Sequence, residues 1–232
     1  CSVSLKAGRA AEAGAIAVVV FDNVAAFTPP AFSFGGGNVT VPTVTIVNAA
    51  GTLLQNTPGV RVTLAASGGI EIPGQVASSS SRGPDMVADV IKPDVSAPGS
   101  DVVSTAAGQG TEGVAFSGTS MASPHTAGVL ALVKQAHPTW EPLDLRAAVM
   151  NTANPTVYTI TGLDEQNNPT TQPMPISRQG AGVINAYRAV RTTTLAMGPN
   201  QTGGISFGFK AVVNTLTDTR TLMVHNKGTT AR

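Results

Sequence analysis

Several residue types that mark particular protein classes are scarce in this chain. One of its 232 residues is cysteine, which excludes an internal disulfide. Lys and Arg number 14 against 13 Asp and Glu, and the net charge of +1 predicts neither a nucleic-acid partner nor a membrane-surface partner. No apolar run approaches the length of a membrane span. Charged residues are 12% and aromatic residues 4%, which is typical of packed α/β or β structure with many small residues.

The most informative stretch is residues 116–128, which read FSGTSMASPHTAG. The residues after Ser120 are nearly all small or apolar as far as His137, and this pattern predicts a helix buried on most faces. Pro124 is expected in its first turn, where a missing N–H costs little, and Pro138 marks its end because a residue before proline leaves the helical region. Ser120 is therefore predicted at or next to the helix N-terminus.

Ser120 has the surroundings that a nucleophilic serine needs. At a helix N-terminus, unpaired backbone N–H groups and the positive end of the dipole, roughly half a charge, stabilise an oxyanion on a substrate carbonyl. Gly118 has no side chain, so a substrate can approach the backbone closely. The alternative is that Ser120 is only a helix cap, because the serine hydroxyl is favoured at that position.

The segment 118–125, followed by Ala127 and Gly128, resembles the nucleophile signature of the subtilisin-like serine proteases, or subtilases. The lipase and esterase pattern G-x-S-x-G does not fit, because Ala122 stands where that pattern needs glycine. The site residues that the resemblance implies are Ser120 as the catalytic nucleophile, Thr119 as an aid to the oxyanion hole, and Phe116, Ser117 and Gly118 as substrate-binding positions.

Three further stretches resemble landmarks of the subtilase domain. Residues 78–84 resemble a loop that precedes the nucleophile, and residues 92–99 resemble the strand and turn that follow this loop. Residues 178–190 resemble the closing segment of the domain. Asp94 lies in the second stretch. The resemblance implies that it is not the catalytic aspartate, and its sequence context favours a role at a turn or strand start.

The three histidines lack the sequence context of the family's catalytic base. His125 lies five residues after Ser120, about one and a half turns along the helix, and is interpreted as a packed structural residue. His137 is expected to contact the C-terminal helix dipole or to be exposed, and His225 lies in a strand-like stretch. The triad aspartate and histidine and the oxyanion asparagine are therefore expected upstream of this chain.

The resemblance also implies a division into three parts. Residues 1–66 resemble the later part of a protease-associated domain, with any small α/β module as the alternative. Residues 67–191 match the C-terminal part of the catalytic domain, and residues 192–232 the start of a fibronectin-type-III-like β-sandwich. The expected fold is α/β, with a partial subtilisin-like three-layer parallel-sheet domain. Without the first strands of that sheet, the central helix is expected to expose an apolar face.

Local patterns predict the remaining elements. Helices are expected at residues 4–14, 49–55 and 141–155, and strands at residues 15–21, 39–46, 60–65, 102–107, 204–213 and 219–224. Residues 108–113 are expected to form a polar turn. Residues 161–172 are expected to form a polar loop, since the adjacent Asp164 and Glu165 lack the spacing of a calcium site.

The resemblance predicts a serine endopeptidase that cleaves polypeptide substrates through an acyl-enzyme on Ser120, with this chain alone inactive. A non-catalytic module that binds peptides or proteins is the leading alternative. No cofactor or metal is predicted, and the oligomeric state is open. Subtilases with such an insert and a trailing sandwich are mostly secreted or cell-wall proteins, which implies an extracellular location.

Overall fold

The computed structural model describes residues 3–25, 39–65, 74–77, 79–85, 87, 90–164, 169–199, 202–208 and 210–230. The chain divides into two compact units. Unit 1 comprises Cys1–Ser79, Gly99–Met121 and Thr159–Gln172. Unit 2 comprises Ser80–Pro98, Ala122–Tyr158 and Pro173–Arg232. Each unit thus combines segments that are far apart in the sequence.

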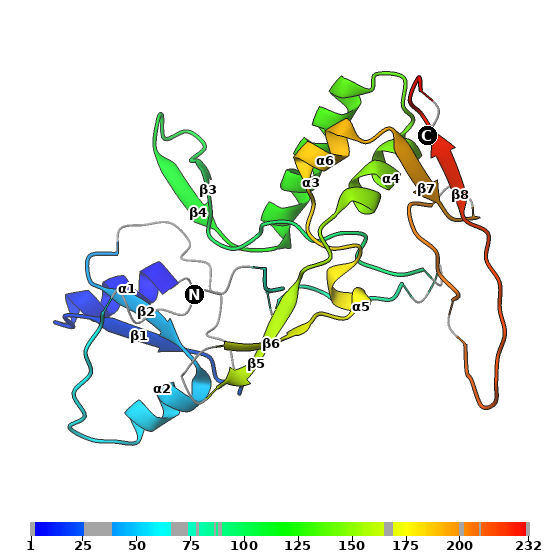
Figure 1. Ribbon diagram of the computed structural model, residues 1–232. Coiled ribbons are helices and arrows are strands. Elements are labelled where there is room, and N and C mark those ends of the chain that lie inside the picture. The colour runs from blue at the N-terminus through cyan, green and yellow to red at the C-terminus, as the bar shows by residue number, and fades with distance from the viewer. Residues whose placement is uncertain are drawn as a thin grey trace. The chain divides into compact units, whose positions relative to one another are not determined.

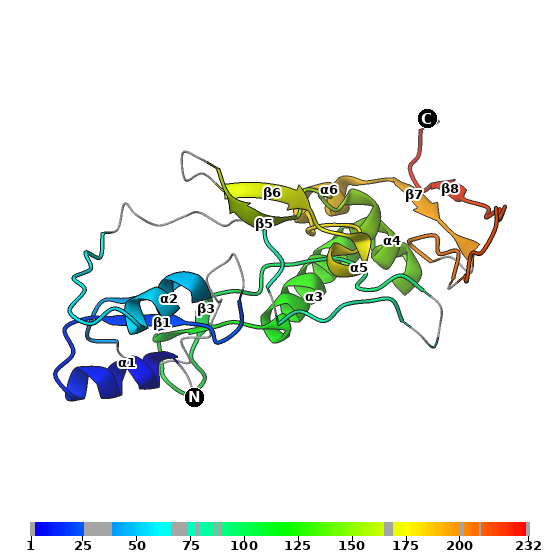
Figure 2. The same ribbon diagram turned by 90° about the horizontal axis from the view of Figure 1, so that it is seen from below.

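The N-terminal part of unit 1 is a small α/β arrangement. Its elements are α1 (Val3–Glu12), β1 (Val18–Phe21), β2 (Thr43–Ile46) and α2 (Asn48–Gln55). The two strands are parallel, and Figure 2 shows α1 and α2 on opposite sides of β1. Gly51 of α2 packs directly on the Phe21 ring, because a Cβ at this position would lie 2.1 Å from a ring carbon. The two helices and two strands predicted here are confirmed, with shifted boundaries.

Two further strand pairs belong mainly to unit 1. β3 (Val102–Thr105) runs antiparallel to β4 (Gly113–Phe116), so that Val102 faces Phe116. β5 (Tyr158–Leu163) pairs with β6 (Pro169–Pro173). The strand predicted at residues 102–107 is confirmed, and a turn lies within residues 108–113, where Gly108 and Gly110 have φ values of 74° and 66°.

Three predictions for unit 1 are wrong or incomplete. Residues 60–65 form no strand but are irregular and exposed, so their alternating pattern pairs with no neighbour in the described part of the chain. The predicted polar loop at residues 161–172 instead lies largely in β5 and β6, and β4 was missed altogether. Glu165 lies outside the described residues. In these cases, pairing with a neighbour rather than the local residue pattern decides where a strand forms.

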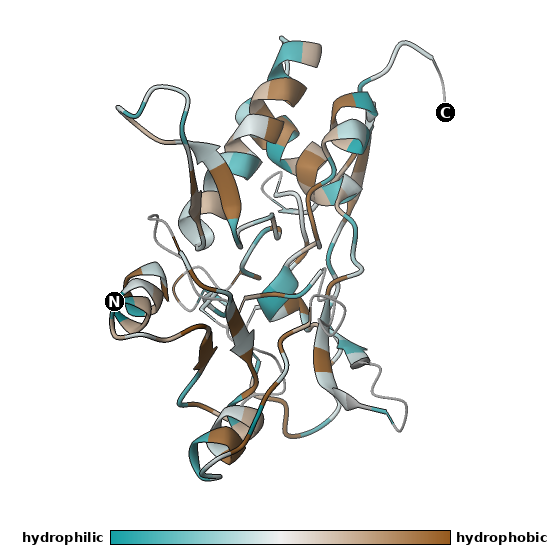
Figure 3. Ribbon diagram, turned by 90° about the vertical axis from the view of Figure 1, so that its left-hand side faces the viewer, coloured by the Kyte–Doolittle hydropathy of each residue, from teal (hydrophilic) through white to brown (hydrophobic). Residues whose placement is uncertain are grey.

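Unit 2 is built around α3 (Thr119–Ala136), whose residues from Ala122 onward belong to it, and α4 (Pro142–Thr152). It also contains α5 (Ile176–Gln179), α6 (Ala186–Arg191), β7 (Thr194–Met197) and β8 (Met223–Asn226) (Figure 1). Apolar and polar residues are interspersed along its helices (Figure 3). The buried core consists of Val129, Val133, Trp140, Ala147, Ala148, Val149, Ala189, Leu195 and Met197.

The helix α4 begins as the sequence predicts. Pro142 occupies its first turn, and Glu141 and Asp144 form a capping box in which the Glu141 N–H donates to Asp144 Oδ2 at 3.2 Å. Asp144 is buried, and the Nζ of Lys227, the residue after β8, lies 3.0 Å from its carboxylate. The Asp144 carboxylate therefore interacts favourably both with the positive end of the helix dipole and with the Lys227 ammonium group.

The helix α3 differs from its prediction in two respects. It begins at Thr119, so Pro124 lies inside the helix rather than in its first turn and provides no N–H for the Ser120 carbonyl. It is also less buried than predicted, because Val129 and Val133 are its buried residues while Leu132 is 49% exposed. The exposed Leu132 is in line with the expectation that this helix exposes an apolar face, which itself stays a prediction.

The strand β7 packs on α4 and pairs with β8. The two strands are antiparallel, and Leu195 and Met197 of β7 are fully buried in the core of unit 2. The strand predicted at residues 219–224 is confirmed only at its end, since β8 begins at Met223, and the described residues within 204–213 form no strand. The start of a separate sandwich domain at residue 192 stays a prediction.

Residues 180–184 run between two other segments of unit 2. The Ser96 N–H donates to the Gly182 carbonyl at 2.8 Å and the Ile184 N–H donates to the Ser96 carbonyl at 2.9 Å. Val183 exchanges two backbone bonds with Asn154, at 2.7 and 2.8 Å. Gly182 is required here, because its φ is 116° and a Cβ would lie 2.0 Å from the Asn154 oxygen.

We expect Gly182→Ala to destabilise unit 2 by about 2 kcal/mol or more, because the methyl group meets backbone that cannot move without breaking this pairing. Urea unfolding followed by the fluorescence of Trp140, the single tryptophan, measures the effect within the same unit. Gly128→Ala is the matched control. It adds a methyl group to α3 with nothing within 4 Å and should stabilise the helix by about 1 kcal/mol. An unchanged midpoint for Gly182→Ala would contradict the steric argument.

Candidate active site

Ser120 is the second residue of α3 and is exposed, as the sequence predicts for its position. The Met121 N–H donates to the Gly118 carbonyl at 3.0 Å, which closes the first turn of the helix. Within the described part of the chain, the N–H groups of Thr119 and Ser120 have no acceptor. They are the unpaired donors that a helix N-terminus presents, and they are available to an oxyanion.

Hydrogen bonds join the turn that leads into α3 to the segment before β3. The Gly118 N–H donates to the Gly99 carbonyl at 2.7 Å. The Asp101 N–H donates to Ser117 Oγ at 2.8 Å, and Ser117 Oγ donates to Asp101 Oδ1 at 3.2 Å. We call this pair of bonds the Ser117 clasp. Asp101 was missed by sequence reasoning, and only the β3–β4 register, in which Val102 faces Phe116, places it beside Ser117.

The five residues predicted for the site are consecutive and span the β4–α3 junction. Phe116 ends β4 and is 42% exposed, Thr119 and Ser120 are exposed, and Ser117 and Gly118 are half-buried. Gly118 has a φ of 151°, a conformation that residues with a side chain rarely adopt. The junction therefore presents a hydroxyl, backbone donors and an aromatic ring on accessible chain.

The histidine side chains contact other parts of the protein. His125 is exposed rather than packed, which corrects the prediction, and its Nδ1 lies 3.0 Å from the Pro98 carbonyl oxygen. His137 is half-buried, stacks on Trp140 with ring centroids 3.8 Å apart, and lies 2.8 Å from the Val190 carbonyl oxygen. The sequence predicted exposure or a helix-dipole contact for His137 and did not predict this stacking. His225 lies in β8, as its strand-like context predicts.

Comparison with known proteins identifies the family. The family model described as "Subtilase family" matches residues 7–182. The chain belongs to the subtilase family. It is 34% identical over 214 residues to the minor extracellular protease Vpr of Bacillus subtilis (strain 168), a match that covers 88% of this chain and 24% of that protein.

Plant subtilases match shorter parts of the chain. The subtilisin-like protease SBT3 of Solanum lycopersicum is 39% identical over 129 residues, which is 50% of this chain and 17% of that protein. The subtilisin-like protease SBT4.12 of Arabidopsis thaliana is 46% identical over 90 residues, covering 34% of this chain and 12% of that protein. The chain thus spans about a quarter or less of the length of these relatives.

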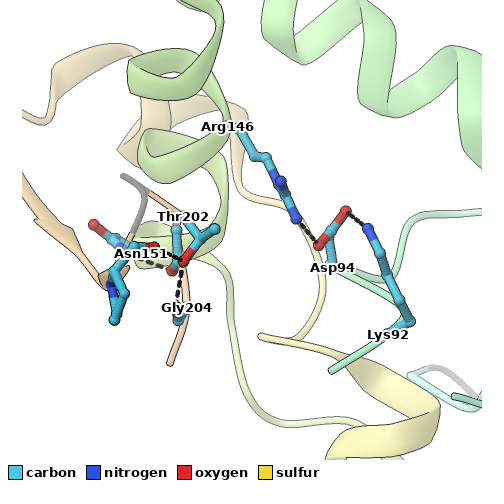
Figure 4. A network of polar contacts seen from close by, with 8 residues as sticks. Lys92, Asp94, Arg146, Asn151, Thr202 and Gly204 are labelled. Carbon is cyan, nitrogen blue, oxygen red and sulfur yellow. Dashed lines mark hydrogen bonds and ion pairs between the residues drawn. The ribbon is translucent and has the colours of Figure 1, made fainter. Parts of the chain in front are cut away.

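Asp94 of this subtilase chain is held in an ion-pair network in unit 2. Lys92 Nζ lies 2.8 Å from its Oδ2 and Arg146 Nη2 lies 2.6 Å from its Oδ1 (Figure 4). Burial raises the pKa of Asp94, but the hydrogen bonds and charges of Arg146 and Lys92 outweigh burial and hold it below its usual value. Its backbone carbonyl also accepts a bond from Ala181. Asp94 thus ties the loop of residues 92–94 to α4 and to the closing segment.

Within the described ranges, no three His, Cys, Asp or Glu side chains lie together as metal ligands would. No helix in those ranges is both long enough and apolar enough to cross a membrane.

We expect Asp94→Asn to lower the stability of unit 2 at pH 7 by about 1 to 3 kcal/mol, because Arg146 and Lys92 lose their charged acceptor. The pKa of Asp94 is lowered in the folded chain, so its contribution is full above its usual value of 3.8 and is lost as the pH falls through the folded value. Urea midpoints from Trp140 fluorescence should therefore differ at pH 7 and converge in acid. Glu12→Gln, an exposed acid in α1, controls for net charge, and a pH-independent difference would contradict the pairing.

Proposed function

We propose that this chain belongs to a serine endopeptidase and supplies its nucleophile, Ser120. The observation that carries the proposal is the position of Ser120 on the first turn of α3, exposed and beside backbone N–H groups that have no acceptor in the described part of the chain. Membership of the subtilase family supports the same reading, because relatives carry names of proteases. The expected substrates are polypeptides.

The chemistry follows from these groups. Ser120 Oγ attacks the carbonyl carbon of the scissile peptide bond while its proton passes to a histidine base. The N–H of Ser120 and the Thr119 hydroxyl stabilise the oxyanion that forms. The C–N bond then breaks, the amine leaves with the proton from the base, and water hydrolyses the ester on Ser120. Phe116, Ser117 and Gly118 border the substrate in this proposal.

The base is proposed to lie outside this chain. His125 and His137 contact backbone carbonyl oxygens, and His225 lies in β8. We therefore place the triad aspartate and histidine and the oxyanion asparagine in an upstream segment of a longer protein. We also propose that the chain has three parts. These are a partial protease-associated domain at residues 1–66, catalytic-domain sequence at residues 67–191 and the start of a β-sandwich at residues 192–232.

A non-catalytic module is the second candidate. The same histidine contacts favour it, because a serine without a base is a helix cap rather than a nucleophile. Such a protein would bind peptides or protein partners through the same junction. An extracellular location is proposed for either function, since one relative is named an extracellular protease.

A fluorophosphonate probe separates the two functions, because it labels a serine only when a base activates it. We expect the longer natural protein to be labelled at Ser120 and the isolated chain to remain unlabelled. Ser120→Ala in the longer protein is the control and should abolish both labelling and peptidase activity. Absence of labelling in the longer protein would favour the binding module, and labelling of the isolated chain would show that it contains a base.

A second prediction concerns the oxyanion. In the longer protein, we expect Thr119→Val to lower kcat by about 10- to 100-fold with little change in KM, because the lost hydroxyl acts on the transition state. Thr119→Ser retains the hydroxyl and is the matched control. Equal kcat values for the valine and serine variants would exclude a role for the Thr119 hydroxyl.

A further inference from the structure

The Ser117 clasp bridges a gap in the backbone hydrogen bonding between the two sides of the β3–β4 hairpin. The backbone ladder of the β3–β4 hairpin ends at the Val102 and Phe116 pair. One residue further out, the bonds between Asp101 and Ser117 run through the Ser117 side chain instead of backbone carbonyls. The next bond, from the Gly118 N–H to the Gly99 carbonyl at 2.7 Å, is again between backbone groups. The clasp thus continues the hairpin as far as the turn into α3.

The turn needs such support because of Gly118. Its φ of 151° is readily reached by glycine, but the absence of a side chain also leaves this residue many other conformations. Ser120 follows two residues later, so a rotation at Gly118 changes the direction in which the hydroxyl and the N–H point. Holding Ser117 and the Gly118 N–H in place removes that freedom before substrate binds.

The backbone conformation of Asp101 suits its contact with Ser117. Its φ of 49° makes it the one non-glycine residue with positive φ among those described. This left-handed conformation suits aspartate and asparagine better than most residues, and here the Asp101 N–H and carboxylate both meet Ser117 Oγ. The hydroxyl is held twice, as acceptor and as donor, which fixes its rotamer.

From these contacts we infer that Asp101 is a positioning residue for the nucleophile. Through Ser117 it fixes the β4–α3 junction so that Ser120 Oγ and the Ser120 N–H meet the scissile carbonyl together. Asp101 contacts no reacting atom in this scheme. The inference rests on the proposed peptidase function.

The test uses two substitutions of Asp101 in the longer natural protein. Asp101→Gly keeps the left-handed backbone but removes the carboxylate, and Asp101→Asn keeps both the backbone conformation and the Oδ1 acceptor. We expect Asp101→Gly to lower kcat by about tenfold or more with KM nearly unchanged, since small displacements of reacting groups are costly. Asp101→Asn should restore kcat to near the wild-type value.

Two further variants make the test specific. Glu112→Gln removes an exposed carboxylate at the far end of the same hairpin and should leave kcat unchanged. In a Ser117→Ala background, Asp101→Gly should have little additional effect, because its action passes through the Ser117 hydroxyl. Circular dichroism and the thermal midpoint of each variant show whether it remains folded.

The outcomes separate this inference from the proposed function. The peptidase function stands if the wild type is active and Ser120→Ala is inactive. In that case, a normal kcat for Asp101→Gly would overturn the positioning role. A kcat for Asp101→Asn as low as that for Asp101→Gly would overturn it as well. Additive losses from Asp101→Gly and Ser117→Ala would also overturn it. A wild type without activity or Ser120 labelling overturns the peptidase function and this inference with it.

Discussion

The burial of α4 is the constraint on which unit 2 depends. Ala147, Ala148 and Val149 of this helix are buried in the core beside Leu195 and Met197 of β7. Small side chains on α4 let its neighbours approach closely: a Cβ at Gly203 would lie 3.1 Å from the Ala147 Cα. Removing this apolar surface from water is the main favourable contribution to the stability of the unit.

Charged groups on the same helix hold segments that are distant in the sequence. Arg146 binds Asp94 across 52 residues, and Asp144 binds Lys227 across 83. Each of these charges has an opposite partner, which offsets the cost of placing it in a buried or half-buried position. Asn151 adds a contact to β7, because its Oδ1 accepts a hydrogen bond from the Ala196 N–H at 2.7 Å. The helix therefore fixes both the loop of residues 92–94 and the C-terminal strands.

The local elements could be predicted from the sequence to a useful extent. Pro142 and Asp144 predict the N-terminus of α4. Short periodic patterns predict α1, β1, β2 and α2. The position of Ser120 at a helix N-terminus also follows from the run of small and apolar residues after it. The extent of burial could not be predicted in the same way, because Leu132 is apolar yet half exposed, and burial depends on which neighbours are present.

The sequence by itself determined the family signature around Ser120, the start of α4 and the glycines that tolerate unusual φ values, because these depend on neighbouring residues. Only the tertiary structure decided that Asp101 meets Ser117, that Arg146 meets Asp94, and that Gly182 lies against Asn154. Each of these contacts joins residues at least 16 positions apart. Such pairs are set by how strands and helices pack, and no local pattern of side chains specifies them.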